Sequence, residues 1–234
     1  MSTDRKIAWF GIGLSLLGLI PIFRDASLQL IVAYCLLFGA LLAFFLYAAF
    51  RTSGPQYATL SLEKKLTIHQ KDGSKASLER KQKIRVRYGS IQEVWCRSIY
   101  ADGTVDNFQV DGVDVPAYDQ LWSGPIVDLR KRFPEAIFSN HEAPEVVWTY
   151  DLHDSFPDKH EALDHEVTPG TEEVQLKVVL PADRICKNAA MHELVAGDAV
   201  GQLDDPVISV DRRTITSTVK APKNGHTLRL NWDW

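Results

Sequence analysis

Two long stretches near the start of the chain carry no charged residue, and they limit what this part of the chain can form. Residues 7–23 and 28–50 are uncharged and mostly apolar. As helices rising about 1.5 Å per residue they would span about 25 and 34 Å, against a hydrocarbon core of about 30 Å. Only residues 24–27 separate them. We therefore expect residues 1–51 to form a transmembrane helical hairpin.

The charges that flank these stretches predict their orientation. Arg5 and Lys6 precede the first stretch, and Arg51, Lys64 and Lys65 follow the second. Under the positive-inside rule both termini and the following region are expected in the cytoplasm. A cleaved signal peptide is the alternative for the first stretch, but no small-x-small cleavage motif follows it.

Small residues recur at four-residue spacing within both apolar stretches, at Gly11 and Ser15 and again at Gly39 and Ala43. Such residues let helices approach closely in lipid, so we expect them to pack the hairpin's helices together or to join protomers. Neither stretch contains Asp, Glu, Lys, Arg or His, which excludes a charge-lined pump. A pore would have to be formed by several copies.

The remainder of the chain shows the two-residue periodicity of strands after the break at residues 52–55. Residues 91–100 and 104–110 flank Asp102-Gly103, which predicts a hairpin, whereas 125–133 is the best helical candidate. We expect a mainly β cytoplasmic region, an antiparallel barrel or sandwich, either continuous or in two lobes. The two lobes would be a basic ligand-binding domain at 56–140 and an acidic sandwich-like domain at 141–234.

Charge is segregated along the chain. Residues 51–100 have a net charge of +7, and residues 101–234 have a net charge of −12. In an extended strand at 79–88, side chains alternate between two faces, and one face would carry four cations. These are Lys81, Lys83, Arg85 and Arg87.

Four cations spaced about 6.6 Å apart would attract the phosphates of a nucleotide or short oligonucleotide. Aromatic residues in the same half of the chain, among them Tyr88 and Trp95, would stack on its bases. The expected ligand-binding residues are therefore Lys81, Lys83, Arg85, Arg87, Tyr88 and Trp95. The alternatives are a solvated outer face, a face attracted to anionic lipid, and docking of the basic lobe on the acidic one.

Motifs for catalysis are absent from the sequence. There is no Gly-rich phosphate loop, HExxH or GxSxG, and His192-Glu193 lacks the second His of a zinc helix. Cys35, Cys96 and Cys186 form no CxxC pair, which fits a reducing compartment. We expect no enzyme activity, no metal and no cofactor.

A short transmembrane hairpin followed by a β-rich domain resembles the bacterial two-transmembrane, β-strand-rich effectors that accompany nucleotidyltransferases in antiphage defence. The resemblance covers about residues 7–140, with the stretch from Asp72-Gly73 through Arg87 and the stretch 101–103. It implies an oligomeric channel of the inner membrane, a tetramer or similar, gated by a cyclic nucleotide or short single-stranded oligonucleotide made by a partner nucleotidyltransferase.

A second hypothesis leaves out the channel. The chain would then be a membrane-anchored β-sandwich adaptor that recruits a protein partner through its acidic lobe, with the basic strand facing lipid headgroups.

Overall fold

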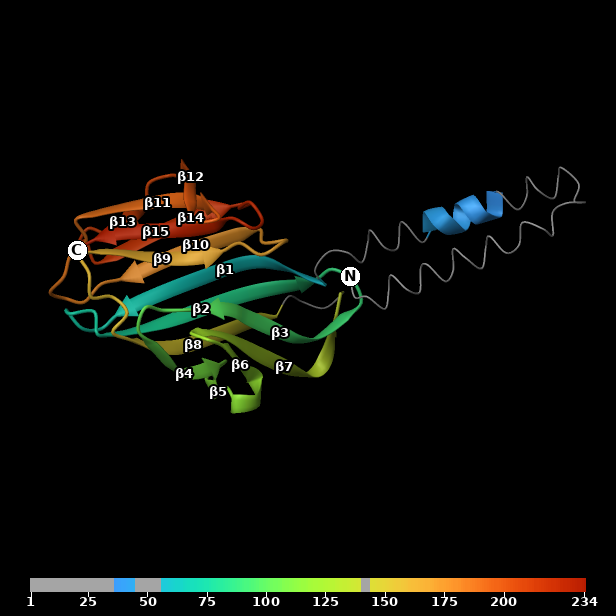
Figure 1. The fold of residues 1–234 in the computed structure, drawn as a ribbon, viewed down its shortest axis with the longest axis horizontal. Coiled ribbons are helices and arrows are strands. Elements are labelled where there is room, and N and C mark those ends of the chain that lie inside the picture. Colours follow the sequence, from blue (N-terminus) through green and yellow to red (C-terminus); the bar gives the residue numbers. More distant parts are fainter. Residues whose placement is uncertain (1–35, 45–55, 140–143) are drawn as a thin grey trace, which may run out of the picture. The chain divides into compact units, whose positions relative to one another are not determined.

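A computed structural model describes residues 36–44, 56–139 and 144–234 of the 234-residue chain. The chain divides into two compact units, Met1–Ser53 and Gly54–Trp234. All of the described strands belong to the second unit, which Figure 1 colours from cyan to red.

In the first unit the structure describes one helical segment, residues 36–44. It contains Gly39 and Ala43, and both residues are exposed. No helix in the described part of the chain is both long and apolar enough to cross a membrane. For these residues the expected fold class, a membrane protein with a transmembrane hairpin, is wrong. Gly11, Ser15 and the rest of the expected hairpin lie outside the described residues.

The second unit is built almost wholly from strands, because its sequence alternates apolar and polar side chains over short stretches. The strands are β1 Tyr57–Ile68, β2 Lys75–Val86, β3 Ser90–Ile99, β4 Thr104–Val110, β5 Val113–Asp114, β6 Gln120–Ser123, β7 Ile126–Phe138, β8 Glu145–His153, β9 His160–Glu166, β10 Glu173–Val179, β11 Asn188–Val195, β12 Asp198–Gln202, β13 Val207–Ile208, β14 Thr214–Lys220 and β15 Thr227–Asp233, with a 3-10 turn at Ala117–Asp119.

These strands form three sheets. The largest has the order β13-β14-β10-β1-β2-β8-β4-β5, and the two smaller ones are β12-β11-β15-β9 and β3-β7-β6. One hydrophobic core takes residues from all three, for example Trp148, Leu230 and Leu129. In Figure 1, β9 and β3 lie on either side of the central strands β1 and β2. Each of them is the edge strand of its own small sheet.

The core-facing side of β1 and β2 is not uniformly apolar. Antiparallel pairing sets Leu62 opposite Gln82, Lys64 opposite Arg80, and Leu66 opposite Leu78. Directly opposed residues share a face of the sheet, and the leucines are buried. The alternation of these strands therefore points two cations toward the interior.

Two local expectations are wrong. Residues 126–138 form the strand β7 instead of a helix, because Val127 and Leu129 are fully buried at strand spacing beside β3. The hairpin expected from 91–100 and 104–110 does not form, because β3 pairs with β7 and β4 pairs with β8. In both cases tertiary pairing overrides the local signal.

The largest sheet takes strands from both sides of position 140, since β2 pairs with β8 and β1 pairs with β10. The expected division into separate domains at 56–140 and 141–234 stays a prediction.

Candidate functional site

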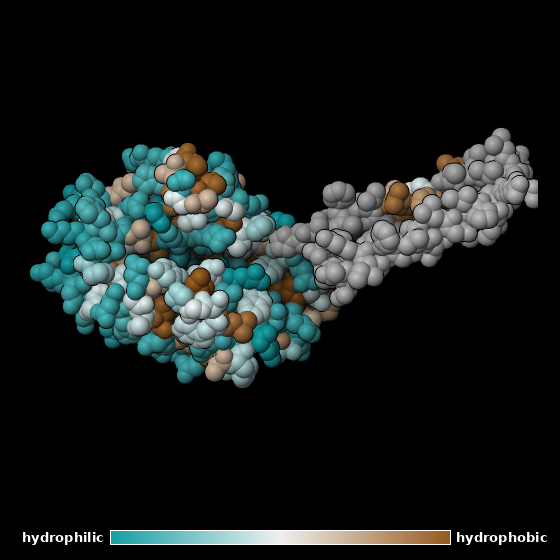
Figure 2. All heavy atoms as spheres, viewed as in Figure 1, coloured by the Kyte–Doolittle hydropathy of each residue, from teal (hydrophilic) through white to brown (hydrophobic). Residues whose placement is uncertain are grey.

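A cavity of about 1300 Å³ lies between the edge strands β3 and β9, with the inner face of β1 and β2 as its floor. Side chains from β8 and β15 complete its lining. Figure 2 shows a hollow across the middle of this face, bordered mainly by hydrophilic residues. The cavity is thus a cleft in the sandwich where the two small sheets do not meet.

Two cations lie side by side on the floor of this cleft. Lys64 and Arg80 are directly opposed partners on β1 and β2, and both line the cavity. Arg80 is 8 % exposed. Among the described residues its Nε has no hydrogen-bond partner, and its terminal nitrogens reach only Cys96 Sγ and Gln82 Oε1, each at 3.4 Å. Lys64 Nζ donates to the backbone oxygen of Asp164 at 2.7 Å.

No ion pair among the described residues includes either of these cations. Burial is the main cause that lowers the pKa of Lys64 to about 8; the positive charge of Arg80 acts in the same direction, and the negative charge of Asp164 acts against it. Burying a charge without a counter-charge is costly, and two like charges in direct opposition repel. The floor therefore has a deficit of negative charge.

His165 extends this polar region from β9. It is 5 % exposed, and its Nε2 has no partner. Burial holds its pKa well below the ordinary value for histidine, and the charges of Arg80 and Lys64 act in the same direction. The imidazole is therefore neutral at physiological pH and able to donate or accept a hydrogen bond.

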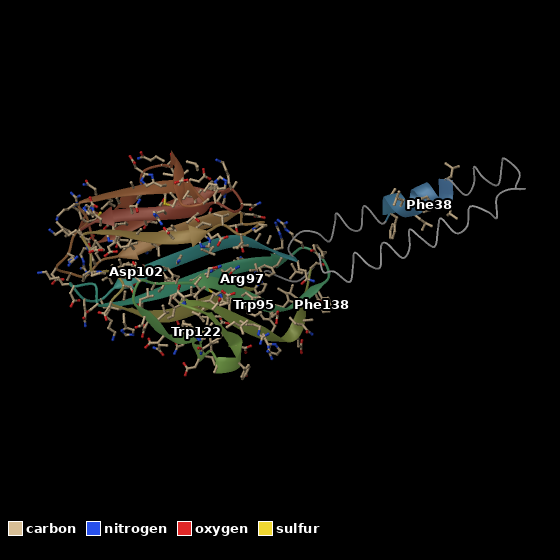
Figure 3. All side chains as sticks on the ribbon, viewed as in Figure 1. Phe38, Trp95, Arg97, Asp102, Trp122 and Phe138 are labelled. Atoms are coloured by element: carbon tan, nitrogen blue, oxygen red, sulfur yellow. The ribbon has the colours of Figure 1, made fainter. Side chains whose placement is uncertain are left out.

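Aromatic side chains border the cationic floor. Tyr57, Trp95 and Tyr150 line the cleft, and burial is the main cause that raises the pKa of both tyrosines. The guanidinium groups of Arg97 and Arg130 lie 5.9 and 5.2 Å from the Trp95 ring centroid. These contacts hold the indole at the edge of the cleft, and Figure 3 shows Trp95 beside Arg97.

The other end of the cleft is acidic. Asp102, Asp158, Glu161 and Asp233 line it, and Figure 3 shows Asp102 well separated from Trp95 and Arg97. Tyr100 donates from its hydroxyl to Asp102 at 3.2 Å. The cleft is thus polarised, with cations on its floor and carboxylates at one end.

The basic residues singled out in the sequence lie elsewhere. Lys81, Lys83 and Arg85 share the outer face of β2, since Gln82, Ile84 and Val86 are buried, and Arg87 directly follows the strand.

Carboxylates interrupt this outer row of cations. Lys81 pairs with Glu79 at 3.3 Å and Arg85 with Glu172 at 2.5 Å, and Lys83 lies opposite Glu145. A Cβ on Gly170 would lie 2.7 Å from Arg87 Nη2, so this guanidinium rests on the glycine. The outer face therefore resembles the solvated face that was the alternative interpretation.

Of the six expected ligand-binding residues, Trp95 alone lines the cleft, and Tyr88 follows the end of β2. Sequence reasoning missed Lys64 and Arg80. A signal was present, because Arg80 and Gln82 lie in the same alternation as Leu78, Ile84 and Val86. A cation at a strand position that shares its face with apolar residues indicates a buried charge.

No protein-family model matches the chain, and no curated protein is similar to it. Solved structures are similar over part of their length. The M1 zinc metallopeptidase from Deinococcus radiodurans is 11 % identical, with a TM-score of 0.41, over 75 % of this chain and 42 % of that one. Yeast LTA4 hydrolase in complex with Bestatin is 9 % identical, with a TM-score of 0.44, over 75 % and 28 %. The chain spans less than half of either protein.

The expectation that the chain is not an enzyme is withdrawn, because the solved structures to which it is similar are enzymes by their names. The expectations of a transmembrane channel and of a defence role are withdrawn as well, because neither the described helix nor these neighbours support them. At such identities and TM-scores the likeness carries no argument for peptidase activity in this chain. The expected homo-oligomer, nucleotidyltransferase partner, membrane association and inner-membrane localisation stay predictions, as does the adaptor hypothesis.

Proposed function

We propose that the unit Gly54–Trp234 binds an anionic nucleotide in the cleft between β3 and β9. Its phosphate would lie on Lys64 and Arg80. The observation that carries this proposal is the pair of directly opposed, inward-facing cations with no carboxylate partner. A bound phosphate would supply the missing charge and accept hydrogen bonds from both.

The donors on the cleft floor favour an acceptor-rich ligand. Arg80 Nε is buried without a partner, and the ammonium of Lys64 makes one hydrogen bond, to a backbone oxygen. Gln82 is already fixed, because its amide donates to Thr59 Oγ1 at 3.0 Å. Phosphate oxygens are such acceptors, and arginine can bind two of them at once.

Size and aromatic lining favour a nucleotide over a bare anion. Pockets for drug-sized ligands have volumes of about 300–1,000 Å³, so a cleft of about 1300 Å³ accepts a larger molecule such as a dinucleotide. Tyr57 and Trp95 offer surfaces on which a base stacks, an interaction worth about 1–3 kcal/mol per base. A nucleotide is also the ligand that the sequence resemblance implies.

Calorimetric titration of the full chain tests this proposal. Cyclic di-GMP, cyclic di-AMP and inorganic phosphate would each be titrated at two salt concentrations into wild type, Arg80→Met and Arg85→Met. We expect dinucleotide binding that Arg80→Met weakens by about 10- to 100-fold, the value of a charge-assisted hydrogen bond. Arg85→Met removes the same charge from the outer face and is expected to bind like wild type.

The converse result overturns the proposal. If Arg85→Met and not Arg80→Met abolished binding, the outer face would be the site. If the wild-type protein bound none of the three probes, the cleft would have no role in nucleotide binding.

A further inference from the structure

Glu161 and Trp232 form the acidic end of the cleft as a cross-strand pair. They are opposed residues of β9 and β15, and both line the cavity. On β9, Glu161 shares its face with Leu163 and His165, which are buried. Glu161 and His165 are four steps apart along β9, which corresponds to about 13 Å. A ligand that reaches both ends of the cleft is therefore elongated.

Both members of this pair have unused hydrogen-bonding capacity. The backbone N–H of Asp158 donates to Glu161 Oε1 at 2.6 Å and fixes the carboxylate, whereas no described residue donates to Oε2. Trp232 is 1 % exposed, and its Nε1 has no hydrogen-bond partner among the described residues. A buried donor without a partner costs free energy, so this N–H, on the residue directly opposite Glu161, indicates a missing partner.

The charge at this end differs from that on the floor. Burial raises the pKa of Glu161 to about 7, with Asp158 and Asp102 as further causes. The groups that influence it do not include Lys64 or Arg80. At pH 8 the Glu161 carboxylate is ionised and acts only as an acceptor.

We infer that Glu161 and Trp232 recognise the guanine base of the bound nucleotide. This inference rests on the proposed function, because it places the phosphate on Lys64 and Arg80. The Watson–Crick edge of guanine presents N1–H and a 2-amino group beside the acceptor O6. A carboxylate matches the two donors, and the indole N–H matches the acceptor.

Other bases fit this pair less well. Adenine and cytosine present one amino donor beside a ring nitrogen that accepts, so a carboxylate oxygen would face a lone pair. Hypoxanthine keeps N1–H and O6 but lacks the 2-amino group. Each missing or opposed hydrogen bond at such a site lowers the affinity by about 5- to 150-fold.

The test compares bases on one protein at pH 8. Full-length wild type would be titrated with cyclic di-GMP, cyclic di-AMP, GMP, IMP and AMP, and so would Glu161→Gln and Glu145→Gln. We expect wild type to prefer guanine over adenine by about tenfold or more, with IMP weaker than GMP. Glu161→Gln presents a donor and an acceptor together, so its preference is expected to move toward adenine.

Glu145→Gln is the matched control, because it makes the same change on β8 at an exposed position that does not line the cleft. It is expected to keep the guanine preference. If wild type bound guanine and adenine compounds equally, the inference would be overturned while the proposed function stood. If no nucleotide bound, both would fail. The comparison of GMP with IMP on wild type decides the matter even if Glu161→Gln does not fold.

Discussion

Lys64 on β1 and Arg80 on β2 are directly opposed on the inner face of the largest sheet, and neither forms an ion pair with a described carboxylate. Interiors rarely hold charges without partners, because desolvation is not repaid. An arrangement that destabilises the free protein is expected where binding requires it.

Replacing Lys64 by methionine is expected to stabilise the ligand-free protein. The change removes a repelling charge and keeps the aliphatic stem that packs on the floor. We expect the free energy of unfolding to rise by about 1 kcal/mol, equivalent to roughly 2–4 °C in Tm. Thermal unfolding followed by circular dichroism measures this. A fall in Tm would mean that the hydrogen bond from the ammonium to the backbone oxygen of Asp164 outweighs the cost of the buried charge.

The pH dependence of stability gives a second check on Lys64. Its pKa is about 8 in the folded protein, below the ordinary value of 10.5, so the unfolded chain binds more protons between these values. The penalty for the buried ammonium is complete below pH 8 and disappears as the pH rises toward 10.5, so stability should increase across this interval. Denaturant unfolding at several pH values tests this, and Lys64→Met should lack the increase.

The outer face of β2 is expected to contribute little to stability or to nucleotide binding. Arg85 and Glu172 are both about half exposed, and exposed ion pairs are worth about 0–1 kcal/mol. Glu172→Gln should therefore change the free energy of unfolding by less than about 1 kcal/mol and leave nucleotide affinity unchanged. A large loss of affinity would return attention to the basic row of Lys81 to Arg87.

Gly73 is expected to be far less tolerant of substitution than Gly89. Both have positive φ, at +75° and +67°, but a Cβ on Gly73 would lie 1.7 Å from the backbone oxygen of Phe156, whereas one on Gly89 meets nothing within 4 Å. Gly89→Ala should cost about 1 kcal/mol through backbone strain alone. Gly73→Ala should cost more than about 3 kcal/mol, because the backbone at Phe156 must also move. Equal effects in chemical denaturation would contradict this.

The alternation in β2 was readable from the sequence, but the face that is buried was not. The four cations from Lys81 to Arg87 formed the obvious pattern, while Arg80 lay unnoticed in the apolar phase. Which phase faces inward depends on the neighbouring strands, and β8 lies more than 50 residues from β2 along the chain. The cleft needs β9 and β15 as well, so its lining follows from tertiary pairing that no local pattern encodes.

The segment at 126–138 shows the same limit. Ile126, Leu129 and Phe133 have helical spacing, yet Val127 and Leu129 are the residues that become fully buried, in a strand. Both patterns are present in the sequence, and pairing of β7 with β3 selects the second.

The central claim is that the two cations on the cleft floor remain unpaired because they bind an anionic nucleotide. The most direct test is thermal unfolding of full-length wild type and Arg80→Met, each with and without saturating cyclic di-GMP. Arg80→Met is expected to raise the Tm of the free protein and to reduce the stabilisation by the ligand by about 1.4–2.7 kcal/mol, as a 10- to 100-fold weaker affinity requires. An Arg80→Met protein that is less stable than wild type and is stabilised by the nucleotide as strongly as wild type would contradict this expectation.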